Sequence, residues 1–318
     1  MIDRLWIDCT DPASVRLAKA LIDRADIEVK VTVREGAGTE KMAKFLGLNF
    51  DIIGKHGGKD PYGKLIASIQ RMKELAEYAK KLKGYAFYTH SSVEGTRVAY
   101  GLGLRPIITS DDTPWSIYVA NLIIPLCGYH IVPIWTKGLW SVKHSKNNHP
   151  TLVLYDGVKE VEWTKAIELN WKPRYILVRE PEVEASYLNY EFKEFHLLAK
   201  DFDNVSYAKR YEGFYDMIKL IANSYCVVTL CGSTVGKEAC LLGVPTVMYT
   251  KGISSMALSV LNYLKDKGLP VYGASSYEEL KSLVNRFIQE PVIWDTKDML
   301  KRMESPIDYI DQILRQKD

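Results

Sequence analysis

Short hydrophobic runs alternate with longer segments of helical periodicity along most of this chain. In the first half, strand-like runs occupy residues 5–9, 28–33, 49–53, 85–89, 106–110 and 129–134. Residues 12–24 place apolar side chains at helical spacing. Apolar positions from Leu65 to Leu82 predict a long amphipathic helix, with Gly84 as its C-cap. Strands that alternate with helices form right-handed βαβ units and a parallel sheet.

The rhythm breaks at residues 138–150, a polar stretch that predicts an exposed loop before a strand at 151–155. A second α/β series follows, and it ends in a helical tail that begins near residue 294 and has no strand after it. Its predicted strands are residues 174–178, 204–209, 225–230 and 245–249. The pattern predicts an α/β fold of two Rossmann-like, doubly wound parallel-sheet domains that face each other across a cleft. The expected divisions are residues 1–157, 158–300 and 301–318.

Composition excludes several classes of protein. The 318 residues are 47% hydrophobic and 25% charged, which is typical of a globular chain and not of a disordered one. The net charge of +3 is too small for nucleic-acid binding by bulk charge. Five cysteines in a chain of this length argue against a disulfide framework. With acidic residues near the start and no long apolar stretch, we expect a soluble, cytoplasmic protein.

The strongest local signal is a strand that runs into a small-residue turn and then a helix. After the strand 225–230, Gly232 permits close backbone approach, and Ser233 or Thr234 can cap the helix. The free N–H groups and the helix dipole at such an end suit a diphosphate. Glu238, one turn further, has a carboxylate that could accept hydrogen bonds from two ribose hydroxyl groups. A purely structural turn with a capping serine explains the spacing equally well.

Two superficially similar motifs point elsewhere and are rejected. The segment from Gly232 to Lys237 is one residue too short for a Walker A loop, and Glu238 stands where that loop needs Ser or Thr. Asp201 and Asp203 form an Asp-x-Asp pair before a strand, which favours a solvated turn over a metal site. Because no Cys or His pair has zinc spacing, we expect no metal.

Several blocks, taken in order, resemble the archaeal and bacterial domain-of-unknown-function three-five-four family. The turn from Cys231 to Ala239, with the Leu-Leu-Gly-Val-Pro that follows shortly after it, resembles that family's Gly-Gly-Thr-Met-x-x-Glu-Ala block. The other blocks are Trp6-Ile7-Asp8, Gly54-Lys55-His56-Gly57-Gly58, His90-Ser91-Ser92, Tyr155-Asp156-Gly157-Val158-Lys159-Glu160 and Val178-Arg179-Glu180-Pro181-Glu182. Their common order makes the resemblance specific over nearly the whole chain.

That family is similar to GT-B glycosyltransferases and to UDP-N-acetylglucosamine 2-epimerases. The resemblance implies that the C-terminal domain holds a nucleotide-diphosphate sugar, UDP-linked, with no metal or other cofactor. It also implies that the N-terminal domain serves the acceptor and that the last helix crosses back to it. Gly232, Ser233 and Thr234 would contact the diphosphate, Glu238 would hold the ribose, and Arg179 would lie near the phosphates.

Three departures from these relatives bear on the reaction. Cys231 replaces the usual Gly and narrows the space for a pyrophosphate. Ser92 stands where the epimerases carry a catalytic Asp, and their His-Arg-x-Glu-Asn element is reduced to Arg179-Glu180. Glycosyl transfer is therefore favoured. A non-catalytic nucleotide-sugar-binding protein and an epimerase-like isomerase are the alternatives.

Glycosyl transfer needs a base for the acceptor hydroxyl, and the first half offers candidates at its strand ends. His90 follows one predicted strand, and Asp111 and Asp112 follow the next, while Asp8 ends the first. His56 lies in a Gly-rich loop that gives its ring little to pack on. The alternatives are a buried, hydrogen-bonded role for His90 and helix capping for Asp8 and Asp112.

Lysines and aromatic residues suggest further partners. Ten basic residues lie between positions 41 and 83, and a solvated helix face explains most of them. The alternative is docking to an anionic membrane surface or to a lipid-phosphate acceptor; a glycan is the other acceptor class. Trp115, Tyr118, Trp135 and Trp140 lie close in sequence, where core packing is a commoner explanation than sugar stacking.

Overall fold

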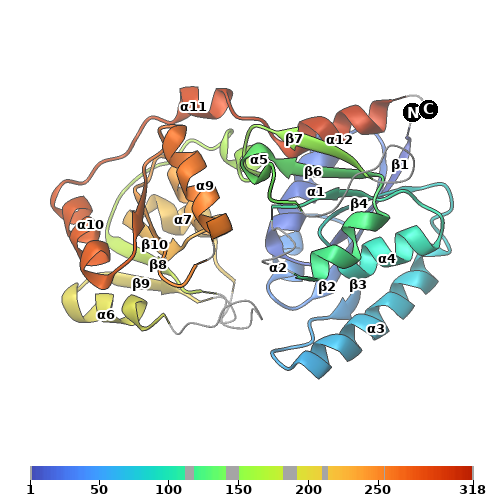
Figure 1. Ribbon diagram of the computed structural model, residues 1–318, viewed down its shortest axis with the longest axis horizontal. Helices are drawn as coiled ribbons and strands as arrows, with labels where there is room; N and C mark the ends of the chain where they lie inside the picture. Colours follow the sequence, from blue (N-terminus) through green and yellow to red (C-terminus); the bar gives the residue numbers. More distant parts are fainter. Residues whose placement is uncertain are drawn as a thin grey trace. The chain divides into compact units, whose positions relative to one another are not determined.

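The computed structural model describes residues 2–111, 118–140, 150–181, 192–209, 214–253 and 255–316. It divides into a first unit of residues 1–162 with 305–318 and a second unit of residues 163–304 (Figure 1). Asp112, Trp115 and most of the polar stretch before residue 150 lie outside the described residues.

The first unit is built on a seven-stranded sheet whose paired strands are all parallel. The strand order is β3-β2-β1-β4-β5-β6-β7, so the chain reverses its direction of growth between β3 and β4. The strands are β1 (Arg4–Cys9), β2 (Glu28–Glu35), β3 (Asp51–Lys55), β4 (Ala86–His90), β5 (Ile107–Thr109), β6 (Tyr129–Pro133) and β7 (Thr151–Tyr155). Each strand-like run of the sequence therefore forms a strand, as predicted.

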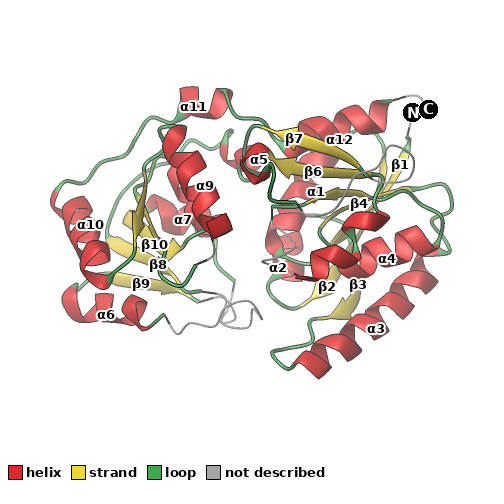
Figure 2. Ribbon diagram, in the orientation of Figure 1, coloured by secondary structure: helices red, strands yellow, loops and turns green. Residues whose placement is uncertain are grey.

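Helices cover both faces of this sheet (Figure 2). The α-helices are α1 (Pro12–Arg24), α2 (Thr39–Phe45), α3 (Pro61–Ala79), α4 (Val93–Gly101), α5 (Val161–Thr164, across the unit boundary) and α12 (Pro306–Arg315). The described residues of this unit also form short 3-10 helices at Tyr118–Leu122, Ile124–Leu126 and Ile134–Thr136. Asp11 begins α1 because its carboxylate accepts hydrogen bonds from the amides of Ala13 and Ser14.

The long helix α3 differs from its prediction at both ends. It begins earlier, where the Asp60 carboxylate accepts a hydrogen bond from Gly63 N, and it ends at Ala79. Gly84 adopts a left-handed φ of +83° but lies beyond the helix, in the turn before β4. The predicted C-cap at Gly84 is therefore wrong, because the turn at residues 80–85 intervenes between helix and strand.

The C-terminal helix α12 packs in the first unit, against α1. Arg24, the last residue of α1, donates to Asp308 at 2.6 Å and to Glu162 at 2.7 Å. Ile307 and Ile310 of α12 are fully buried. Arg24 thus joins the end of α1 both to α12, through Asp308, and to α5, through Glu162.

The second unit carries a five-stranded parallel sheet in the order β12-β11-β10-β8-β9. Its strands are β8 (Tyr175–Arg179), β9 (Val205–Ala208), β10 (Ser224–Leu230), β11 (Thr246–Tyr249) and β12 (Val271–Ala274). Its helices are α6 (Lys193–Asp201), α7 (Met217–Ala222), α8 (Thr234–Leu241), α9 (Ser255–Asp266), α10 (Tyr277–Gln289) and α11 (Lys297–Lys301). Only β12 was not predicted from the hydrophobic pattern.

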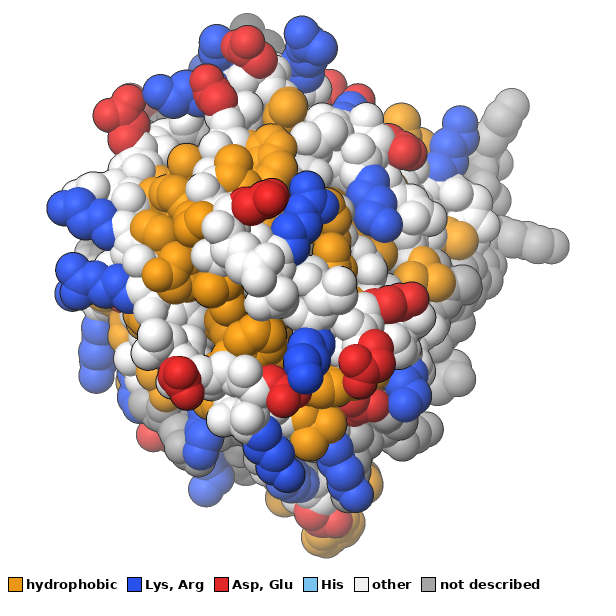
Figure 3. Space-filling model, turned by 90° about the vertical axis from the view of Figure 1, so that its left-hand side faces the viewer, with side chains coloured by type: hydrophobic (Ala, Val, Ile, Leu, Met, Phe, Trp, Pro, Cys, Tyr) orange, Lys and Arg blue, Asp and Glu red, His pale blue; other side chains and the backbone are white. Residues whose placement is uncertain are grey.

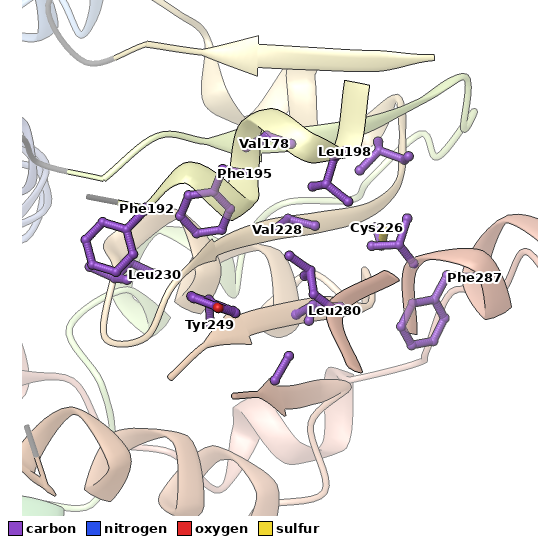
Figure 4. Close-up of a cluster of buried hydrophobic side chains, with 14 residues drawn as sticks. Val178, Phe192, Phe195, Leu198, Cys226, Val228, Leu230, Tyr249, Leu280 and Phe287 are labelled. Carbon is purple, nitrogen blue, oxygen red and sulfur yellow. The ribbon is translucent and has the colours of Figure 1, made fainter. Parts of the chain in front are cut away.

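Successive residues of the central strands β8 and β10 point to opposite faces of the sheet and pack into two separate hydrophobic cores. Val178 and Val228 point into a cluster with Phe195 and Phe287 (Figure 4), whereas Leu177 and Val227 join the cluster on the opposite face of the sheet. A strand that is buried on both faces needs apolar residues at successive positions. This explains the nearly continuous apolar run in the sequence of β10. Outside these cores the surface is mixed, and one face shows hydrophobic patches among lysines, arginines and acids (Figure 3).

No helix in the described part of the chain combines the length and apolar character needed to cross a membrane. Open α/β folds bind their ligands at the carboxyl ends of the parallel strands.

Candidate functional site

The turn after β10 has the geometry that the sequence predicts for a phosphate-binding element. Gly232 takes a left-handed φ of +87°, which reverses the chain between the strand and α8. Ser233 is the N-cap, and its Oγ accepts a hydrogen bond from Gly236 N at 3.1 Å. Thr229 Oγ1 lies 2.7 Å from the same Oγ and holds that side chain against the strand.

Capping leaves other donors of α8 available. The first amides of a helix have no acceptor within the helix, and the Ser233 side chain serves only the third. In the described part of the chain, the amides of Thr234 and Val235 have no hydrogen-bond acceptor. Ser233 and Thr234 are half-buried, so the positive end of the helix dipole lies at a partly accessible place.

Arg179 lies at the same edge of the sheet. It is the last residue of β8, and β8 pairs with β10 through Val178 and Val228. Its Nη1 donates to Ala208 O at 3.0 Å, at the end of β9. The arginine thus ends the strand beside the one that leads into the turn between β10 and α8, and its hydrogen bond to Ala208 O orients the guanidinium.

Two neighbouring side chains are buried. Glu238 is 2% exposed, and its Oε1 accepts a hydrogen bond from Trp163 Nε1 at 2.8 Å. Burial raises the pKa of the Cys231 thiol to about 12, so this side chain is neutral at physiological pH. The hydrogen bond from the Trp163 indole fixes the position of the Glu238 carboxylate, the group expected to hold the ribose.

A second group of polar side chains gathers in the first unit, from the residues that follow β4, β5 and β7. His90 Nε2 lies 3.5 Å from Asp111 Oδ1, and His90 Nδ1 lies 2.9 Å from Thr109 Oγ1. Lys159 Nζ forms an ion pair with Asp111 and lies 3.1 Å from Glu160 Oε1. We call His90, Asp111, Lys159 and Glu160 the strand-end cluster.

The strand-end cluster is almost closed to solvent. The side chains of Lys159 and Glu160 are 4% and 0% exposed, and those of His90 and Asp111 are 9% and 11% exposed. Burial, followed by the charge of Asp111, raises the pKa of Tyr155 well above its ordinary value, so its phenol stays neutral. A histidine, two carboxylates and a lysine in such a place can hold and relay a proton.

Backbone strain marks the same edge. Ser91, directly after His90, has a φ of +59°, and its Oγ donates to Thr109 O at 3.1 Å. Left-handed backbone at a non-glycine residue costs energy and is concentrated at functional sites. The strained turn sets the direction in which His90 leaves its strand.

Asp8, another candidate base, has a structural role instead. Its carboxylate is fully buried and accepts from Arg71 Nη2 at 2.6 Å, from Ser92 Oγ at 2.6 Å and from Thr32 Oγ1 at 2.7 Å. Both carboxylate oxygens are thus taken up by a buried cation and two hydroxyls. The helix cap that was considered for Asp8 is provided by Asp11.

His56 stands apart from the strand-end cluster. It follows β3, which is three strand spacings from β4, or about 14 Å at the usual separation between strands. The half-buried ring accepts a hydrogen bond from Gly58 N at Nδ1, 3.2 Å away, so the neutral ring carries its proton on Nε2. The structure therefore unites His90 and Asp111 and separates His56 from them.

Sequence reasoning missed Lys159 and Glu160 as site residues. Both belong to the Tyr-Asp-Gly-Val-Lys-Glu block, which was noted only as a motif. The sequence signal that could have revealed them is a lysine next to a glutamate just after the predicted strand at 151–155. This position lies at the same edge of the sheet as His90. Without the strand order, nothing in the sequence connects them to Asp111, 48 residues away.

Comparison with known proteins now defines the family. Residues 3–175, more than half of the 318, match the family described as "Protein of unknown function (DUF354)". The chain belongs to this family. An uncharacterized protein of Methanocaldococcus jannaschii is 32% identical over 137 residues, which cover 42% of this chain and 39% of that protein. The match therefore spans well under half the length of that relative.

Solved structures share the fold at low sequence identity. UDP-GlcNAc 2-epimerase from Neisseria meningitidis, bound to UDP-GlcNAc, is 13% identical with a TM-score of 0.61 over 98% of this chain and all of its own. The glycotransferase of kitacinnamycin is 12% identical with a TM-score of 0.62 over the whole of both chains. MurG of Acinetobacter baumannii is 12% identical with a TM-score of 0.53 over 99% of this chain and all of its own. The fold is the two-domain, Rossmann-like, GT-B-like architecture.

Proposed function

We propose that this protein is a glycosyltransferase-like enzyme that takes a sugar from a nucleotide diphosphate, UDP-linked, without a metal or other cofactor. One observation carries the proposal. The Ser233-capped end of α8 offers the amides of Thr234 and Val235 at the carboxyl edge of the sheet, beside the strand that ends in Arg179. Oriented amides, a helix dipole and an arginine together form a site for a diphosphate.

Each element has a distinct task in this proposal. The α8 amides and Ser233 bind the diphosphate, and the Arg179 guanidinium stabilises the charge that grows as the diphosphate leaves. Glu238, oriented by Trp163, accepts hydrogen bonds from the ribose hydroxyls. Gly232 is needed because only glycine adopts its φ of +87° without strain next to a bound ligand.

The strand-end cluster supplies the base in this proposal. The bond between the sugar anomeric carbon and the diphosphate oxygen breaks, and a bond from that carbon to an acceptor hydroxyl oxygen forms. The hydroxyl proton passes to the pair of His90 and Asp111, while Lys159 keeps the carboxylate in place. His56 is the second candidate base, and its neutral tautomer is defined by Gly58 N.

The cluster also favours an enzyme over a protein that only binds nucleotide sugars. Binding alone does not require four ionisable side chains and a strained serine at one sheet edge. The epimerase alternative has less support, because Ser92 caps α4 and donates to Asp8 where the epimerases carry a catalytic Asp.

A thermal-shift screen over nucleotides, diphosphates and nucleotide sugars tests the binding part. A ligand at a hundred times its dissociation constant stabilises the folded state by about 2.7 kcal/mol and raises the melting temperature by a few degrees. A competent ligand should then release nucleoside diphosphate when glycan and lipid-phosphate acceptors are added. His90→Gln should slow this release at least a hundredfold without changing the shift, whereas His196→Gln, at an exposed position of α6, should change neither. Absence of a shift with every nucleotide would overturn the proposal.

A further inference from the structure

The first two turns of α3 present an apolar face to solvent. Tyr62, Leu65, Ile66 and Ile69 are 70%, 55%, 46% and 51% exposed. They follow the i, i+3, i+4, i+7 spacing that places side chains on one side of a helix. Their number and spacing set them apart from the singly exposed apolar residues found on most protein surfaces.

The core-facing side of α3 is a different one. Arg71, Leu75 and Ala79 are its buried residues, and they lie toward β3 and α4, beside which α3 runs in Figure 1. The helical periodicity of the sequence predicts that Leu65 and Ile69 lie on the buried side of α3. That expectation is wrong over the first two turns, because the buried side of the helix is rotated toward Arg71 and Leu75.

Lysines surround this apolar face. Lys55 and Lys59 lie in the segment before α3, which packs so closely on the first turn that a Cβ on Gly57 would lie 2.5 Å from Lys64 Cα. Lys73 continues the same helix side one turn after Ile69. Lys55, Lys59 and Lys73 are exposed. Exposed acids lie near two of them: Asp60 follows Lys59, and the charge of Lys73 helps to lower the pKa of Glu77 one turn further along α3.

We propose that this surface, the α3 face, docks the protein on an anionic membrane. An apolar helix face that lies in the membrane plane enters the boundary between headgroups and acyl chains, and flanking lysines meet the lipid phosphates. Tyr62, with an apolar ring and a polar hydroxyl, suits that boundary. Lys55, Lys59 and Lys73 are complementary to an anionic leaflet, and they outnumber the exposed acids Asp60 and Glu77 near the face.

A second copy of the chain fits this surface less well. In a two-fold pair each patch meets its own copy, so Lys59 and Lys73 would approach their counterparts and repel them. Four side chains on two helical turns also fall far short of the roughly 800 Å² per partner of a standard interface. The inference does not depend on the proposed enzymatic function.

Vesicle co-sedimentation of the full chain, without nucleotide, tests the proposal. Vesicles of equal parts phosphatidylglycerol and phosphatidylcholine should bind the protein, and binding should weaken as salt is raised. The double change Ile66→Glu with Ile69→Glu should lower the partition coefficient at least tenfold. Its control is Val292→Glu with Ile293→Glu, two exposed apolar residues of the second unit, which should leave binding unchanged.

Charge reversal provides the second arm. Lys59→Glu with Lys73→Glu should reduce binding at least tenfold, because each lysine near an anionic surface contributes measurably. Lys172→Glu with Lys200→Glu, an equal change at exposed lysines of the second unit, should have little effect.

Two outcomes would overturn the inference. One is equal binding by the α3-face variants and their controls. The other is a dimer in sedimentation equilibrium that Ile66→Glu with Ile69→Glu dissociates, with no binding to vesicles. Nucleotide thermal shifts on the same samples report the proposed function separately, so failure of one proposal is distinguishable from failure of the other.

Discussion

At the scale of single residues, buried charges are matched by partners that the fold brings from distant segments. Arg71 is fully buried, pairs with Asp8 through two nitrogens, and also donates to Ile53 O at 3.0 Å. Burial alone would lower the pKa of Arg71, but the charge and hydrogen bonds of Asp8 raise it above the ordinary value. The guanidinium thereby links β1, β3 and α3.

Arg71→Leu should destabilise the first unit by about 3–5 kcal/mol, because the Asp8 carboxylate would remain buried without its cation. Denaturant unfolding followed by circular dichroism measures this loss. Arg97→Leu, on the exposed side of α4, is the matched control and should change stability by less than about 0.5 kcal/mol. Similar losses in the two variants would mean that the buried pair contributes nothing specific.

Arg179→Ala should weaken diphosphate binding roughly tenfold to a hundredfold and leave nucleoside binding nearly unchanged, since a charge-assisted hydrogen bond contributes about 1.5–3 kcal/mol. Calorimetry with UDP and uridine measures both affinities. Arg174→Ala removes an equal charge from an exposed position at the other end of β8 and should affect neither. Equal losses for UDP and uridine in Arg179→Ala would assign this arginine a structural role.

At the scale of elements, strand-turn-helix units were predictable because their signals are local. The run of apolar residues, the glycine and the capping serine of β10 and α8 lie within a few residues of one another. β12 escaped prediction because its apolar run is interrupted by Gly273, at which a Cβ would lie 2.9 Å from Leu261 Cδ2. Close packing of α9 on this strand requires a residue that carries no strand signal.

Ser233→Ala should cost about 1 kcal/mol of stability through loss of the N-cap and should also weaken nucleotide binding. Ser276→Ala provides the comparison, because Ser276 caps α10 through the Glu279 amide in the same way. Melting temperatures should fall similarly in both variants, whereas only Ser233→Ala should lose affinity for diphosphates. Equal affinities in the two variants would remove Ser233 from the site.

At the scale of the whole molecule, the chain forms two units, and its last helix belongs to the first. Thermal unfolding should therefore show two events that respond to different changes. Nucleotide should raise the melting temperature of the second unit. Ile310→Ala, at a fully buried position of α12, should reduce the free energy of unfolding of the first unit by about 2–5 kcal/mol and so lower its melting temperature.

Differential scanning calorimetry with and without UDP assigns the two events. The matched control is Gln312→Ala, an exposed position on the same helix, which should move neither. Suppose instead that Ile310→Ala lowers the melting temperature of the same transition that nucleotide raises. In that case α12 would stabilise the second unit, and the division of the chain would need revision.

Sequence alone determined the α/β class, most of the strands and helices, and the strand-turn-helix unit of β10 and α8, because each depends on residues close together in the chain. Tertiary structure decided which polar groups share a site. Asp8 meets Arg71 across 63 residues and His90 meets Thr109 across 19, and only the order of strands in the sheet brings them together. It also decided which side of α3 is buried. Helical periodicity records that apolar residues recur, but where a helix has two apolar sides, packing against the sheet selects the one that leaves water.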